Sequence, residues 1–288
     1  MSLPESLLKD KIMEFLLEDI GLGDITTELI VPLGTKVRAQ IVVKETAVVA
    51  GLDEMKVIFD IAGAKISCLV KEGDEVAQNT VIAIIEGEGR AILSVERVAL
   101  NILSRMSGIA TETRKLLKKV KEAGLNVRLA ATRKTVPGLR YFDKRAITIG
   151  GGDPHRFRLD DQILIKDNHI IIAGGVEEAL RRVKTSASFF KKIEVEVKTA
   201  EQAVQAAKYG ADIIMLDNMT VNEVGEVINT LKHLGLRDKV LIEVSGRINE
   251  ENIMDYARLE PDIISIGALT HSTKSIDVSL DIIEVRKS

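Results

Sequence analysis

Cysteine is nearly absent from this sequence of 288 residues, in which Cys68 is the only one. No disulfide can form within the chain, and no metal site built from several thiolates is possible. The formal net charge of −3 argues against a general nucleic-acid-binding protein. No apolar run approaches the roughly 20 residues that span a membrane, and Glu5, Asp10 and Glu14 do not fit a signal peptide. We expect a soluble cytoplasmic protein with neither a nucleic-acid nor a membrane partner.

The first part of the chain, up to about residue 110, mixes two hydrophobic periodicities. Apolar residues at helical spacing predict helices, and short apolar runs between turn residues predict strands. The predicted helices cover 7–16, 55–61 and 91–106, and the predicted strands cover 38–44, 64–70 and 81–86. This part is expected to be an α+β module. A faint likeness to a biotin-carrier hairpin around Lys56 is set aside, because that lysine falls within a predicted helix.

From about residue 125 to 270 the pattern becomes regular, with short β-rich runs and helical segments between the later ones. The predicted strands are 127–131, 146–149, 163–165, 193–197, 212–216, 240–244 and 262–266. Such alternation indicates parallel βα units. Seven strands fall one short of a closed eight-stranded barrel. We predict an α/β fold with an incomplete, seven-stranded TIM-like barrel, and an open doubly wound sheet is the alternative.

Candidate functional residues recur where these predicted strands end. Arg133 and Lys134, Lys166, Glu196, Asp217, Ser245 with Gly246, and Gly267 each lie at or just after the carboxyl end of a predicted strand. Ligands of barrels and of open α/β sheets bind at that edge. We therefore expect these residues to share one site.

The residues of this site divide by charge. Six cationic or potentially cationic side chains suit carboxylates and phosphates, namely Arg133, Lys134, Arg140, His155, Arg156 and Lys166. Glu196 and Asp217 beside a phosphate-rich ligand indicate Mg²⁺. The small residues Ser245, Gly246 and Gly267 lie where barrels often hold a phosphate. The pattern predicts an enzyme acting on a small polyanion.

Structural explanations compete for several of these residues. Asp217 precedes Asn218 and could be only a helix N-cap, and one of Glu194 and Glu196 could merely pair with a lysine. The glycines 150–152 could form a plain turn, although their neighbours His155 and Arg156 favour close approach of a ligand. For His169 and His271 a buried hydrogen-bonding role is as good an interpretation as a catalytic one.

Taken in order, the motifs resemble those of the quinolinate phosphoribosyltransferase family of type II phosphoribosyltransferases. The resemblance covers almost the whole chain and is carried by residues 18–27, 96–101, 107–111, 132–135, 150–152, 155–156, 164–169, 194–197, 216–218, 245–246 and 267–271. The chain departs from the family at Arg247, where a second glycine commonly follows Ser-Gly.

The resemblance implies two domains: an N-terminal α/β sandwich over 1–110, completed by the tail 272–288, and a barrel over 111–271. It implies a homodimer, or an assembly of dimers, with shared active sites into which Arg97 reaches from the neighbouring subunit. Thr132 lies in the matched substrate-binding motif. Arg133, His155, Arg156 and Lys166 would hold the quinolinate carboxylates, and Lys134 and Lys166 would contact phosphoribosyl pyrophosphate.

The resemblance also implies that Glu196 and Asp217 bind ribose hydroxyls and Mg²⁺, and that Ser245, Gly246 and Gly267 take the 5′-phosphate. Lys134, Lys166, Glu196 and Asp217 would be the catalytic residues. The expected reaction is phosphoribosyl transfer to quinolinate with loss of CO₂. The alternatives are a nicotinate phosphoribosyltransferase, a paralogue associated with molybdenum transport, and a non-enzymatic barrel that senses a phosphorylated metabolite.

Overall fold

The computed structural model describes residues 3–286, and its chain divides into two compact units. The first unit contains the described residues up to Arg114, the segment Tyr141–Gly151 and the C-terminal segment from Thr273. The second contains Lys115–Arg140 and Gly152–Ser272. No helix within residues 3–286 is long and apolar enough to cross a membrane.

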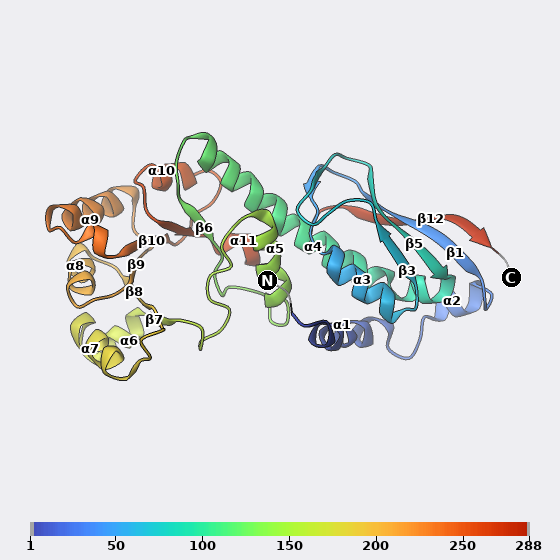
Figure 1. Ribbon diagram of the computed structural model, residues 1–288, viewed down its shortest axis with the longest axis horizontal. Coiled ribbons are helices and arrows are strands. Elements are labelled where there is room, and N and C mark those ends of the chain that lie inside the picture. Colours follow the sequence, from blue (N-terminus) through green and yellow to red (C-terminus); the bar gives the residue numbers. More distant parts are fainter. Residues whose placement is uncertain (1–2, 287–288) are drawn as a thin grey trace. The chain divides into compact units, whose positions relative to one another are not determined.

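The first unit is built on a four-stranded antiparallel sheet with the order β12-β1-β5-β3, in which the C-terminal strand pairs with the first one (Figure 1). Its strands are β1 (Lys36–Val43), β3 (Lys65–Cys68), β5 (Thr80–Glu88) and β12 (Val278–Arg286), with a small pair β2 (Ala47–Val48) and β4 (Glu75–Val76). Its helices are α1 (Glu5–Ile20), α2 (Ile25–Ile30), α3 (Leu52–Ile61) and α5 (Arg140–Gly150), and α4 (Gly89–Glu122) begins in this unit.

Periodicity explains the helices of the first unit. In α1 the buried residues are Leu8, Ile12 and Leu16, four residues apart, so that one apolar stripe faces the core. Lys56 lies in α3, which agrees with the rejection of a biotin-carrier hairpin.

The second unit is an α/β barrel-like fold with six parallel strands in the order β6-β11-β10-β9-β8-β7. These strands are β6 (Arg128–Ala130), β7 (Ile163–Ile165), β8 (Ile193–Val197), β9 (Ile213–Asp217), β10 (Leu241–Ser245) and β11 (Ile263–Ser265). The connecting elements are α6 (Asp167–Ala173), α7 (Val176–Ser186), α8 (Ala200–Lys208), α9 (Val221–His233), the 3-10 helix η1 (Arg237–Lys239), α10 (Ile253–Ala257) and α11 (Ala268–His271). Helices α7, α8 and α9 flank the sheet in Figure 1.

One predicted strand is wrong: residues 146–149 belong to helix α5, in the first unit. Phe142, Ala146 and Ile147 are buried at helical spacing, and a short apolar run cannot by itself distinguish a strand from a buried helix. Within the described residues the parallel sheet therefore has six strands instead of seven. Beside β6, an isolated parallel bridge between Ala130 and Asp153 takes the position of a further strand.

Candidate active site

A cavity of about 240 Å³ lies where the parallel strands of the second unit end. Nine of the predicted site residues line it: Thr132, Arg133, Lys134, His155, Arg156, Lys166, Glu196, Asp217 and Ser245. Ala131, Leu164, Met215, Glu243 and Ser265 complete the lining. Because the strands are parallel and in register, side chains far apart in the sequence meet at the same edge of the sheet.

Two guanidinium groups make one side of this cavity basic. Arg156 is almost fully buried, and its burial lowers the pKa of the guanidinium, an effect that the nearby charge of Arg133 reinforces. Arg133 has a buried Nε atom that finds no hydrogen-bond partner within residues 3–286. Two like charges held together out of water are costly unless an anion joins them. This side therefore fits a ligand with more than one negative charge.

The same cavity is also lined by two acidic side chains, Glu196 near the end of β8 and Asp217 at the end of β9. The Lys166 ammonium lies 3.1 Å from Glu196 Oε2, and Asp217 Oδ2 accepts a hydrogen bond from Asn218 Nδ2 at 2.7 Å. Asp217 is not the N-cap of the next helix, because Thr220 caps α9 in a reciprocal arrangement with Glu223. Two carboxylates lining the cavity are hard oxygen donors of the kind that Mg²⁺ prefers.

The predicted phosphate loops follow β10 and β11. Ser245 pairs in register with Asp217 on one side and Ser265 on the other. Gly246 follows with a φ of +104°, and Gly267 lies against Lys134, so that an added Cβ would be 3.2 Å from the lysine Cδ. Neither glycine lines the cavity itself. Arg247, which stands where the family commonly has a second glycine, is exposed and has a φ of +51°.

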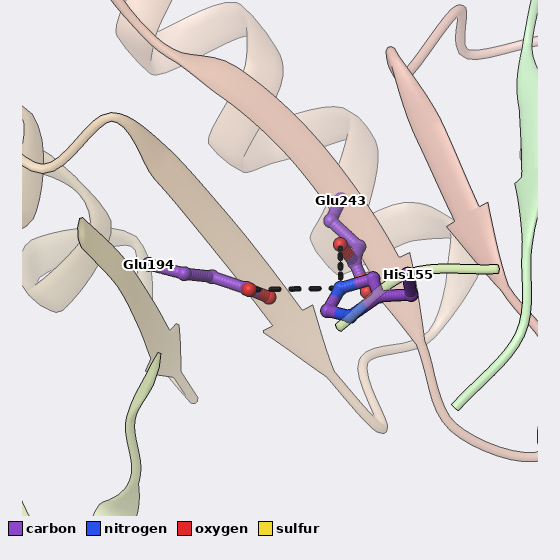
Figure 2. A group of neighbouring side chains, drawn as sticks. All are labelled: His155, Glu194 and Glu243. Atoms are coloured by element: carbon purple, nitrogen blue, oxygen red, sulfur yellow. Dashed lines mark hydrogen bonds and ion pairs between the residues drawn. The ribbon is translucent and has the colours of Figure 1, made fainter. Parts of the chain in front are cut away.

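His155, Glu194 and Glu243 form a cluster in which both carboxylates are buried, and His155 and Glu243 also line the cavity (Figure 2). His155 Nε2 is 3.3 Å from Glu243 Oε2 and 3.6 Å from Glu194 Oε2. Burial, and then the charge of Glu243, raises the pKa of Glu194 to about 8. Glu243 is not among the site residues predicted from the sequence, although a single carboxylate within the otherwise apolar run of strand Leu241–Ser245 could have indicated it.

Other predicted residues have structural partners. The Arg140 guanidinium donates to Thr135 Oγ1 and to the Phe157 carbonyl, and His169 Nδ1 accepts the backbone N–H of Lys166 at the start of α6. Gly150 is packed against α4, since an added Cβ would lie 2.7 Å from the Ala110 carbonyl oxygen. This glycine thus serves packing rather than the approach of a ligand.

Arg97 lies on α4 in the first unit and is not among the residues that line the cavity. Its expected role in a neighbouring site stays a prediction, as do the roles assigned to Gly246 and Gly267.

The fold and the cavity define an α/β-barrel enzyme that handles a small polyanion at the carboxyl ends of its strands. The family model described as quinolinate phosphoribosyl transferase, N-terminal domain, matches residues 24–107, and the model for the C-terminal domain matches residues 109–281. The chain therefore belongs to the quinolinate phosphoribosyltransferase family.

Individual relatives match this chain over most of its length. The chain is 49% identical over 283 residues to a Methanocaldococcus jannaschii protein named "Probable nicotinate-nucleotide pyrophosphorylase (carboxylating)", covering 96% of this chain and 99% of that protein. It is 36% identical to the human nicotinate-nucleotide pyrophosphorylase (carboxylating), covering 82% of this chain and 79% of the human protein. The solved structure of nicotinate-nucleotide pyrophosphorylase from Francisella tularensis is similar with a TM-score of 0.90 and 35% identity, covering 98% of both chains.

Proposed function

We propose that this protein transfers the phosphoribosyl group of phosphoribosyl pyrophosphate to quinolinate, giving nicotinate mononucleotide, pyrophosphate and CO₂ for NAD biosynthesis. The observation that carries this proposal is the pair Arg133 and Arg156 at one cavity of a chain in this family. Quinolinate has two adjacent carboxylates, and two guanidiniums offer matching forked donors. Nicotinate has one carboxylate and would leave part of this charge without a partner.

The residues around the cavity would each handle one part of the substrates. Arg133 and Arg156 bind the quinolinate carboxylates and orient the pyridine nitrogen toward C1 of the ribose. Lys134 and Lys166 bind phosphoribosyl pyrophosphate, and Thr132 lines the same cavity beside Lys134. The backbone N–H of Lys134 donates to Thr132 Oγ1 at 3.1 Å, which shapes the turn that carries Arg133. Ser245, Gly246 and Gly267 take the 5′-phosphate.

Glu196 and Asp217 would hold Mg²⁺ and the ribose hydroxyls, because carboxylate oxygens of two neighbouring strands reach the same cavity. When bound, Mg²⁺ supplies positive charge that offsets the charge of the departing pyrophosphate. Glu196 also keeps Lys166 in place through their ion pair. No other cofactor is part of this proposal.

The chemistry needs positioning more than covalent help from the protein. The pyridine nitrogen forms its bond to C1 of the ribose as the bond from C1 to the pyrophosphate oxygen breaks. The nitrogen is then positively charged, so the electron pair of the bond to the 2-carboxylate can stay on the ring carbon beside it as CO₂ leaves. A proton then takes the place of CO₂ at that carbon. Arg133 and Arg156 keep the ring in place through its carboxylates, of which one remains after CO₂ has left.

We further propose a homodimer, or an assembly of dimers, in which Arg97 serves the neighbouring active site, and a cytoplasmic location. The support is the match to both domains of the family and the resemblance of the segment around Arg97.

The test of the proposed reaction is an assay of the purified protein with Mg²⁺ and phosphoribosyl pyrophosphate, given either quinolinate or nicotinate. Nicotinate mononucleotide formed from quinolinate alone supports the proposal. Product from nicotinate alone would assign the non-carboxylating reaction. No product from either would leave the molybdenum-associated paralogue or a phosphometabolite sensor.

A further inference from the structure

We propose that Glu243, Glu194 and Gln162 are positioning residues that act through His155 and on Arg156. This inference rests on the proposed function, in which Arg156 binds a quinolinate carboxylate.

The hydrogen bonds of His155 determine where its ring carries a proton. The backbone N–H of Arg156 donates to His155 Nδ1 at 2.8 Å. A backbone N–H can only donate, so Nδ1 must keep its lone pair, and the ring proton belongs on Nε2. Nε2 faces Glu243 Oε2 at 3.3 Å, with Glu194 Oε2 at 3.6 Å. Both ring nitrogens are therefore directed to protein groups.

The same tautomer argues against a metal at this cluster. One histidine and two buried carboxylates have the composition of a metal centre, and their ligand atoms lie within 4.8 Å of one another. A metal ion on Nε2 would need the lone pair of that nitrogen while Nδ1 still accepts the Arg156 N–H. The ring would then carry no proton at all, whereas metal-binding histidines normally donate their other N–H to a neighbour.

A second chain of contacts reaches the guanidinium of Arg156. Its Nη1 donates to the Gln162 carbonyl at 3.2 Å, and the Gln162 side chain donates from Nε2 to Glu194 Oε2 at 2.7 Å. The backbone and the side chain of Arg156 are thus each connected to a fully buried carboxylate. This doubly anchored arrangement places one guanidinium at a defined point of the cavity.

The backbone at His155 has an unfavourable conformation that the surrounding contacts must maintain. His155 has a φ of +52°, which is rare for a residue with a Cβ, and its N–H donates to Asp153 Oδ1 at 2.7 Å. Arg156 is buried close to the like charge of Arg133, so its position must be secured by other groups. The cluster supplies this anchoring.

The experiment measures KM for quinolinate and for phosphoribosyl pyrophosphate separately. Glu243→Ala removes the acceptor of the Nε2–H, and Glu243→Gln retains one. Losing a hydrogen bond to a charged acceptor predicts a rise in the quinolinate KM of about 10-fold or more. We expect Glu243→Gln and the control Glu226→Ala, at an exposed glutamate, to stay within about 3-fold of the unchanged protein.

A double-mutant cycle separates positioning from general damage. In an Arg156→Ala background, Glu243→Ala should raise the quinolinate KM no further, because the positioned group is gone. An additive effect in that background would overturn the proposal, as would equal rises in both KM values. Should Glu243→Ala fail to fold, Gln162→Ala takes its place in the same cycle with the same two outcomes.

Titration with Zn²⁺ alone provides a readout besides activity. We expect no stoichiometric binding, and binding that Glu243→Gln abolishes would overturn the proposal in favour of a metal centre. If the unaltered protein makes no product from quinolinate, the proposed function fails, and the Zn²⁺ titration still tests the reading of the cluster.

Discussion

Gly246 and Asn218 are in direct contact where strands β10 and β9 end. A Cβ on Gly246 would lie 2.5 Å from Asn218 Oδ1 and 2.7 Å from the Asn218 backbone nitrogen. That nitrogen donates to the Ser245 carbonyl at 2.9 Å, and the Asn218 amide group holds Asp217. The two loops therefore interlock, and the glycine is required both for its φ of +104° and for the space it leaves.

Gly246→Ala is expected to disturb this interlock. A Cβ here meets backbone, which cannot move away as a flexible side chain could, and the positive φ adds strain of about 1–3 kcal/mol. We predict a lower free energy of unfolding and a raised KM for phosphoribosyl pyrophosphate. The matched control is Gly225→Ala in helix α9, where an added Cβ meets only Leu259 Cδ2 at 3.7 Å. Equal stability of the two variants would contradict the prediction.

Arg133→Ala should weaken quinolinate binding. Its guanidinium has a buried donor with no partner within residues 3–286 and is placed for a carboxylate. Losing a charge-assisted pair costs about 1.5–3 kcal/mol, or roughly a 10- to 150-fold rise in the quinolinate KM. Steady-state kinetics with each substrate varied in turn measure this. Arg158→Ala, at an exposed arginine, is the control and should change little. A normal quinolinate KM in Arg133→Ala would remove this residue from the substrate site.

Asp217→Asn should alter the Mg²⁺ dependence of the rate. The change keeps the shape of the side chain but removes the charge that favours a hard cation. We predict that a higher Mg²⁺ concentration is needed for half-maximal rate. Asp238→Asn, at an exposed aspartate, serves as the control. Superimposable Mg²⁺ titrations of Asp217→Asn and the unaltered protein would refute the role.

Glu54 in the first unit makes stability depend on pH. It is fully buried, and burial raises the pKa of its carboxyl to about 6, although Arg145 at 2.9 Å works in the opposite direction. The folded state then binds the proton more tightly than the unfolded state, so stability falls as pH rises from about 4.5 through 6. The loss is about 2 kcal/mol.

Denaturant unfolding between pH 4.5 and 7.5 measures this slope. Glu54→Gln should lack that component of the pH dependence, and Glu122→Gln, at an exposed glutamate, should retain it. Parallel pH curves for Glu54→Gln and the unaltered protein would show that Glu54 does not titrate in this range.

Arg97→Ala tests the shared active site. If Arg97 serves a neighbouring subunit, mixing inactive Arg97→Ala with inactive Lys134→Ala should restore activity, because each mixed dimer contains one site with both residues intact and one site that lacks both. Subunit exchange must be shown independently with differently tagged chains. Absence of activity in a demonstrated mixed dimer would place Arg97 outside any shared site.

Six of the seven strands predicted for the second unit are confirmed, because short β-rich runs that alternate with helical segments are typical of parallel βα units. The strand predicted at 146–149 was wrong, since a short apolar run with Ala146 and Ile147 suits a buried helix as well as a strand, and the two residues are buried in helix α5. Glu243 is not predicted as a site residue, because its role depends on a contact with His155, which lies 88 residues earlier in the sequence. The tautomer of His155 likewise follows from one backbone contact that no sequence pattern encodes.

The loss of the 2-carboxylate is the central claim, and labelled quinolinate tests it most directly. The protein is incubated with Mg²⁺, phosphoribosyl pyrophosphate and quinolinate carrying ¹⁴C in its 2-carboxyl group, while CO₂ and nicotinate mononucleotide are both quantified. We predict one labelled CO₂ for each nucleotide formed, with neither product in the absence of phosphoribosyl pyrophosphate. A nucleotide that retains the label, or nucleotide made only when nicotinate is supplied, would contradict the account.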